Sequence, residues 1–466
     1  MMAAPTSGQR LALWAMAVAT TATVGLMTLV EHFRIVLSLT AVQADSATMA
    51  IMAVLGEIVL VSVTVIIATI VAQLAFGQAV DELRQQIALR RLVGARRGPE
   101  RRRLVLRCIA TGVLGALIGL VVGMLAAAGV TVALSATLTS WAQAPLPPVQ
   151  PVAALPAAGI AAGAAVAAWI ASRRVLDVAP LEALASSRTD TDFAHPARHR
   201  AGKVLVLIGC GILATGCALG FLTPLAVLVG VVGGVVSVIG IVALSTPMTS
   251  RMLAVIRRPL RATAVGRTAL GSLERSPHRF GGITVALMVG IASVTMFAVA
   301  GATAEQALLR MVADADLYDY QREALAEMTT QLMTVVSLAV GSGSVVAVFG
   351  FIATMLMSVR ARTREIGLLR LVGMRAGQAR SMVVIESAVI AALALTGGLI
   401  IGAVYGWLGT FMMLGSVYDI GPILPAAPWA LLPVLALATA AVAAATAIPA
   451  ARRASAVPPL AAVRSS

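Results

Sequence analysis

The residues with the clearest potential for chemistry are arginines, and they gather in two short segments. Six of them lie between Arg360 and Arg380, in a stretch that separates two long apolar runs, 331–358 and 382–411. Arginine is costly in hydrocarbon, so this stretch must be a short loop at one face of a membrane. Its apolar residues predict an amphipathic turn that ends at a glycine: Ile366, Leu368, Leu369, Leu371, Val372 and then Gly373. Such a helix needs a partner, either the lipid surface or another protein.

The second arginine-rich segment, 86–101, is an earlier copy of the first and aligns with 365–380 without a gap. Nine of its last fifteen positions are identical in the two copies. The same displacement holds downstream, where Gly119 and Gly123 align with Gly398 and Gly402. Chance does not keep one displacement over about ninety residues, so the chain is a duplicated membrane unit with one basic loop helix per copy.

Motifs for catalysis are missing from the sequence. Lys203 is the only lysine, and it lacks the glycine spacing of a phosphate-binding P-loop. There is no GxSxG, HExxH or CxxC pattern. Cys108, Cys210 and Cys217 have no ligand spacing and fall in or beside apolar runs, so they predict neither a metal site nor a disulfide. The sequence therefore predicts a protein that is not an enzyme and binds no cofactor of its own.

Few acidic residues lie inside the apolar runs. Glu57 is about six residues, or about 9 Å, inside the outer end of its run, and Glu386 lies near the inner end of another. Neither is at the midplane, which disfavours a proton relay. Glu57 is a candidate for the substrate path or a structural carboxylate. Tyr318 and Tyr320 are further candidates, in a polar outer segment (302–330) that is either a substrate-gathering lid or a helical cap.

One pair of charges is specific to the duplication. The alignment of the two copies places Arg107 on Glu386, so opposite charges occupy equivalent sites near the inner face. Either each side chain reaches the interface independently, or the two attract each other in one state of a working cycle.

Composition assigns the chain to the all-α integral membrane proteins. Of its 466 residues, 59% are apolar and 12% are charged, and the mean hydropathy is +0.95. Runs of about 20 apolar residues predict ten transmembrane helices: 11–30, 52–76, 106–134, 150–171, 203–221, 224–246, 280–301, 332–358, 382–411 and 429–450.

The distribution of charge predicts the topology. Of 35 Lys and Arg residues, only Arg34, Arg310 and Arg322 fall in the outer loops if both termini are inside. The net charge of +15 is therefore explained by topology rather than by binding to nucleic acid.

The domain organisation follows from the duplication. We expect two parallel four-helix repeats, related by an axis along the membrane normal, and a two-helix insert between them. The predicted boundaries are a first unit (1–185), a linker (186–202), a transmembrane hairpin (203–250), a cytoplasmic linker (251–278) and a second unit (279–466). The outer loops have only about 20 and 30 residues, too few for a large extracytoplasmic domain.

These patterns together resemble the FtsX-like permease family, the membrane subunits of type VII (MacB-like) ABC transporters. The segment REIGLLRLVGMRAGQARSMVVIES (364–387) matches the most recognisable part of that family, and QIALRRLVGARRGPERRRLVL (86–106) is a weaker second copy. The ending ARRASAVPPL and its counterpart RRVLDVAPLEAL are also typical, and RTALGSLERSPHRFGGITVAL (267–287) looks like the start of the first span of such a unit.

The resemblance implies a permease of the bacterial cytoplasmic membrane that works with a cytoplasmic pair of ATPase subunits, which hold the ATP and Mg²⁺. The basic segments resemble coupling helices, in which leucines fill a groove on each ATPase and arginines meet its acidic rim. The coupling residues are Ile87, Leu89, Arg91, Leu92, Gly94 and Arg96, with Ile366, Leu368, Arg370, Leu371, Gly373 and Arg375 in the second copy.

Three functions stay open at this point. Because the outer loops are short, the first is export or extrusion of a molecule that partitions into lipid: a lipid, an amphipathic peptide or a hydrophobic compound. The second is a non-transport mechanotransmitter that acts on an extracytoplasmic partner. The third, a carrier driven by an ion gradient, is disfavoured by the lack of charges at the midplane.

Overall fold

The computed structural model describes most of the chain as long helices. The described residues are 7–39, 47–92, 97–137, 153–176, 196–275, 277–314 and 374–416, with short pieces at 424–426, 428–429, 433–441 and 444–445. Every element among them is a helix. A helix satisfies all of its backbone hydrogen bonds internally, which is what apolar runs of this length require in a membrane.

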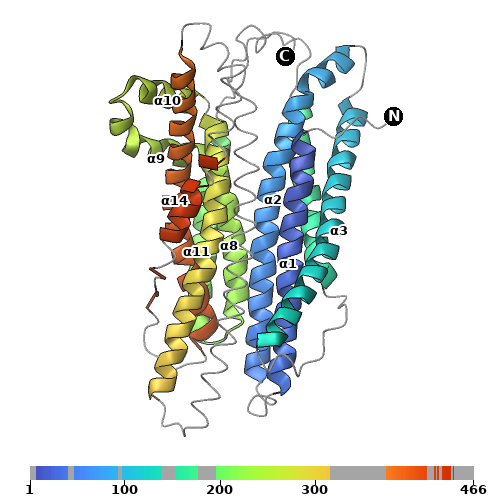
Figure 1. Ribbon diagram of the computed structural model, residues 1–466, viewed down its shortest axis with the longest axis vertical. Helices are drawn as coiled ribbons and strands as arrows, with labels where there is room; N and C mark the ends of the chain where they lie inside the picture. The colour runs from blue at the N-terminus through green and yellow to red at the C-terminus, as the bar shows by residue number, and fades with distance from the viewer. Residues whose placement is uncertain are drawn as a thin grey trace.

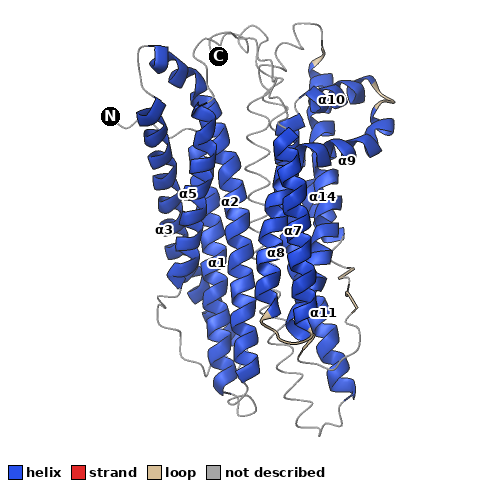
Figure 2. Cartoon of the chain, turned by 180° about the vertical axis from the view of Figure 1, so that it is seen from behind, coloured by secondary structure: helices blue, strands red, loops and turns tan. Residues whose placement is uncertain are grey.

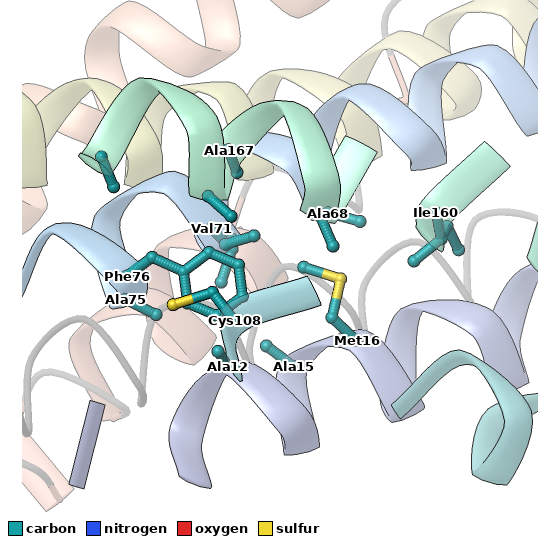
Figure 3. Packing of buried hydrophobic residues seen from close by; sticks show 14 of the residues in the cluster. Ala12, Ala15, Met16, Ala68, Val71, Ala75, Phe76, Cys108, Ile160 and Ala167 are labelled. Atoms are coloured by element: carbon teal, nitrogen blue, oxygen red, sulfur yellow. The ribbon is translucent and has the colours of Figure 1, made fainter. Parts of the chain in front are cut away.

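The first unit contains four helices that pack together, α1 (Ser7–Leu39), α2 (Ala47–Leu92), α3 (Arg97–Thr137) and α5 (Ala154–Leu176). Their shared core is rich in alanine, so the helix backbones approach closely. Figure 3 shows Met16 of α1, Phe76 of α2, Cys108 of α3 and Ile160 of α5 meeting in this core, and all four are buried.

The second group contains the hairpin of α7 (Pro196–Gly220) and α8 (Ala226–Ala243), followed by α11 (Pro277–Asp314) and α14 (Ala376–Leu414). α11 and α14 pack along each other, and both also contact α8. Figure 1 shows α1, α2 and α3 on one side of the molecule and α8, α11 and α14 on the other. α2 is the helix of the first unit that contacts α8 and α11.

Two shorter helices lie between the hairpin and α11. They are α9 (Ser245–Leu260) and α10 (Ala264–Arg275). In both views they project sideways from one end of the bundle, next to α14 (Figures 1 and 2). Their apolar residues join the core of the second group with residues of α11 and α14.

The duplication is visible in how the helices start. α3 begins at Arg97 and α14 at Ala376, and the sequence repeat aligns these same two positions. Arg375 precedes α14, and its backbone N–H donates to Oε1 of Gln378 at 3.0 Å. This bond satisfies one of the backbone donors that a helix start leaves unpaired.

The aligned glycines form equivalent seams in the two copies. A Cβ built on Gly119 would lie 2.6 Å from Cβ of Thr20 and closer still to the carbonyl oxygen of Ala17 in α1. A Cβ built on its aligned partner Gly398 would lie 2.8 Å from Cβ of Ile291 and 2.9 Å from the carbonyl oxygen of Met288 in α11. Only glycine permits this approach between backbones, so α1 with α3 and α11 with α14 are the same helix pair built twice.

The structure contains eight helices that are long and apolar enough to cross a membrane, counted over the described residues. They confirm eight of the ten predicted spans. The predicted span 332–358 lies outside the described residues, and 429–450 is described only as helix at 433–441 and 444–445. The count of ten therefore stays a prediction.

Three segments differ from the sequence-based expectation. The predicted linker 251–278 is largely α9 and α10, and the predicted linker 186–202 ends inside α7, which starts at Pro196. The outer segment 302–330 begins as a continuation of α11 as far as Asp314. Charged or polar residues can extend an apolar helix beyond the membrane without changing the apolar pattern. This explains why α7 and α11 are longer than the spans predicted for them.

Candidate functional site

The two ends of the bundle differ in charge, which orients the candidate sites. Described arginines cluster where α3 and α14 begin and where α9 and α10 lie, whereas Arg34 and Arg310 are at the opposite end. The positive-inside rule predicts that the arginine-rich end faces the cytoplasm. We call it the basic end.

The first predicted coupling segment lies at the basic end. Ile87, Leu89, Arg91 and Leu92 form the last turns of α2, which is one helix of 46 residues from Ala47 to Leu92. The expected short loop helix is thus, in this copy, a continuation of a membrane-spanning helix. When a coupling segment and a membrane span form one continuous helix, a displacement of the segment is transmitted directly to the span.

The other coupling residues can be placed only in part. Gly94 and Arg96 lie outside the described residues, as do Ile366, Leu368, Arg370, Leu371 and Gly373. Arg375 is described, immediately before α14. α14 thus starts at the basic end, where α2 ends.

A cavity lies where the two groups of helices face each other. It encloses about 120 Å³, and its walls come from α2, α7, α8, α11 and α14. Its lining runs along α8 from Val227 to Ile241, beside Val59–Ile67 of α2, Met288–Met296 of α11 and Ile401–Met412 of α14. The walls are almost entirely aliphatic, with representative residues Val63, Ile67, Val231, Val235, Val289, Met296, Ile401 and Leu408.

The few hydroxyl groups at the cavity are largely turned into the walls. The Tyr405 hydroxyl is hydrogen bonded to Oγ of Ser237 at 2.5 Å, between α14 and α8. Oγ of Ser293 donates to the carbonyl oxygen of Gly290 at 2.7 Å. With these polar atoms paired inside the protein, the cavity presents mainly hydrocarbon, which suits an apolar ligand.

Glycine on α8 helps to create this space. Gly234 lines the cavity, and a Cβ built on it would meet nothing within 4 Å. A larger side chain there would point into an open region rather than into a neighbouring backbone. Sequence reasoning did not find the cavity, because its walls come from five helices spread over the chain.

Of the residues predicted for the substrate path, only Glu57 is described. It is half-buried on α2, two residues before Val59, the first residue of α2 at the cavity. Tyr318 and Tyr320 lie outside the described residues. Glu57 is thus near the outer end of the cavity without lining it.

The structure does not bring Arg107 and Glu386 together. Arg107 is exposed on α3, which packs against α1, α5 and α2, whereas Glu386 is buried in α14, which packs against α11 and the helices around it. Figure 1 shows α3 and α14 at opposite edges of the molecule. The pair shares a position in the repeat but not a contact in this arrangement.

Comparison with known proteins agrees with the duplication. The family described as FtsX-like permease C-terminal matches the chain twice, over residues 58–180 and 337–458. The starts of the two matches, 58 and 337, are related by the displacement of the sequence repeat. No curated protein matches the chain in sequence. The two family matches together cover just over half of the 466 residues, and the chain belongs to the FtsX-like permease family.

Proposed function

We propose that the chain is the permease subunit of a MacB-like, type VII ABC transporter that exports or extrudes a membrane-partitioning molecule. Membership of the family indicates a multi-pass membrane subunit of an ABC transporter, and FtsX-like permeases generally work with an ABC ATPase. The observation that carries the substrate class is the aliphatic cavity between the two groups of helices. A lipid, an amphipathic peptide or a hydrophobic compound is the kind of molecule that such walls favour.

The proposed partner is a pair of cytoplasmic ATPase subunits. Two copies of one membrane unit suit a two-fold partner, because each copy can contact one subunit in the same way. The coupling segments meet this pair at the basic end, in a bacterial cytoplasmic membrane with both termini inside. Closure of the ATPases on ATP would then move α2 and the equivalent span in the second copy, and so alter the cavity.

The first prediction concerns the source of energy. We expect the purified chain alone to hydrolyse no ATP, since its sequence offers no loop for the phosphates. Phosphate release would be measured with the chain alone and with its partner ATPase, and a partner that lacks its P-loop lysine serves as the control. Hydrolysis by the chain alone would contradict this assignment.

The second prediction concerns coupling. Leu371→Asp should leave the chain folded but abolish most substrate-stimulated ATPase activity, because a carboxylate replaces an apolar contact on the partner. Gly373→Pro, and to a smaller extent changes at Leu92 and Gly94, should act in the same direction. Ala201→Asp is a matched control, since Ala201 is exposed on α7 near the basic end. Normal assembly and coupling in Leu371→Asp would remove the docking role.

A further inference from the structure

We propose that α9 and α10 form an arm that binds anionic phospholipid headgroups at the cytoplasmic surface of the membrane. The arm, defined as Ser245–Arg275, is absent from both family matches, which end at 180 and resume at 337. The two family matches therefore assign no role to the arm. The proposal is independent of what the permease transports.

The arm concentrates positive charge on its surface. It contains six arginines and one acidic residue, Glu274, which gives a net charge of +5. All six arginine side chains are exposed: Arg251, Arg257, Arg258, Arg261, Arg267 and Arg275. Guanidinium groups match phosphate geometry well, and each basic residue near an anionic membrane adds to the attraction.

Apolar residues of the arm pack against the helix bundle. Leu253 of α9 and Leu270 and Leu273 of α10 are buried in the core formed with α11 and α14. At the start of α9, a Cβ built on Gly281 of α11 would lie 2.9 Å from the backbone of Ser245. The arm is thus held by apolar packing, while its arginines remain exposed.

The position of the arm along the bundle places these arginines at the membrane surface. α8 spans the membrane and ends at Ala243, and α9 begins at Ser245 with only Leu244 between them. α9 therefore starts at the level of the membrane face. Figures 1 and 2 show that the arm extends sideways, beyond α14, rather than along the bundle axis. A helix that leaves the bundle sideways at this level lies over lipid.

An exposed apolar residue supports contact with lipid rather than with water. Val255 is 79% exposed, and it shares a face of α9 with Arg251 and Arg258, one turn away on each side. Apolar side chains between arginines are typical of helices that lie in the interface, where the apolar group enters the acyl region and the arginines reach the phosphates. The alternative occupant is the partner ATPase, and the sideways direction of the arm favours the membrane surface over a partner below the bundle.

The test uses a spin label on the arm of the full chain. Val255→Cys is labelled in a background in which Cys108, Cys210 and Cys217 are replaced by alanine, and Leu117→Cys on the lipid-facing side of α3 gives the reference for immersion. Nanodiscs are made of phosphatidylcholine alone or of phosphatidylcholine and phosphatidylglycerol in a two-to-one ratio. Accessibility to oxygen and to a water-soluble nickel complex reports whether the label is in lipid or in water.

We expect the label to enter lipid when phosphatidylglycerol is present. Each arginine near an anionic surface is worth about fivefold in binding, so Arg251→Gln with Arg258→Gln, on the face of Val255, should lower the equilibrium constant for immersion about 25-fold. Arg102→Gln with Arg103→Gln removes the same charge from exposed positions on α3 and should have little effect. A label that stays in water in both lipids, an equal loss in the control pair, or protection that appears only on adding the partner ATPase would each overturn the proposal.

Discussion

Replacement of Gly119 by leucine is expected to disrupt the packing of α1 against α3 and to lower the equilibrium constant for folding at least tenfold. The Cβ alone would overlap the backbone of Ala17 and press on Thr20. Overpacking of this kind costs about 1–3 kcal/mol, and more where backbone must move, while about 1.4 kcal/mol corresponds to a tenfold change in the equilibrium. Unfolding in detergent, followed by helical circular dichroism, measures the effect.

The same helix offers a matched control. Gly129 also lies in α3, is exposed, and would place a Cβ with nothing within 4 Å. Gly129→Leu should therefore be neutral or slightly stabilising, because leucine favours the helix more than glycine by about 0.5–1 kcal/mol. The repeat predicts a parallel result in the second copy, where Gly398→Leu should destabilise the pairing of α11 with α14. If Gly119→Leu were as stable as Gly129→Leu, the close approach at this seam would be wrong.

Much of the architecture could be predicted because one physical constraint dominates it. Hydrocarbon demands long apolar helices, so hydropathy alone located the spans that α1, α8 and α14 confirm. The glycines that the constant displacement aligns, Gly119 and Gly398, both lie at close contacts between helices. These features depend on local composition and on repetition, and both can be recognised in the sequence.

Features that depend on the packing of distant segments could not be predicted. The cavity exists because α8 passes between α2 and the pair of α11 and α14, and no single stretch of sequence encodes that arrangement. The repeat left two interpretations of Arg107 and Glu386 open, independent side chains or a pair in one state of the cycle, and in this structure α3 and α14 lie at opposite edges of the molecule. The arm was read as a linker, although Leu253, Leu270 and Leu273 carry the amphipathic signal that could have identified it.

Filling the cavity is expected to abolish transport without unfolding the protein. In Gly234→Trp the new side chain starts where nothing lies within 4 Å and extends among the aliphatic walls. It should occupy the volume that the substrate needs, and so reduce transport at least tenfold while basal ATPase activity and assembly persist. Gly211→Trp is the matched control, because Gly211 is exposed on α7 and its Cβ also meets nothing within 4 Å.

The measurement uses proteoliposomes that contain the chain and its partner ATPase. A labelled phospholipid, an amphipathic peptide and a hydrophobic dye are screened on the wild type, and the one that stimulates ATP hydrolysis is then followed across the membrane. Loss of both stimulation and movement in Gly234→Trp, with Gly211→Trp unchanged, would place the substrate in the cavity. Undiminished movement in Gly234→Trp would exclude the cavity from the path. If none of the three probes stimulates ATP hydrolysis by the wild type, export of a membrane-partitioning molecule is contradicted. The mechanotransmitter then becomes the better account, because in such a protein the helices must move but no substrate needs to pass between them.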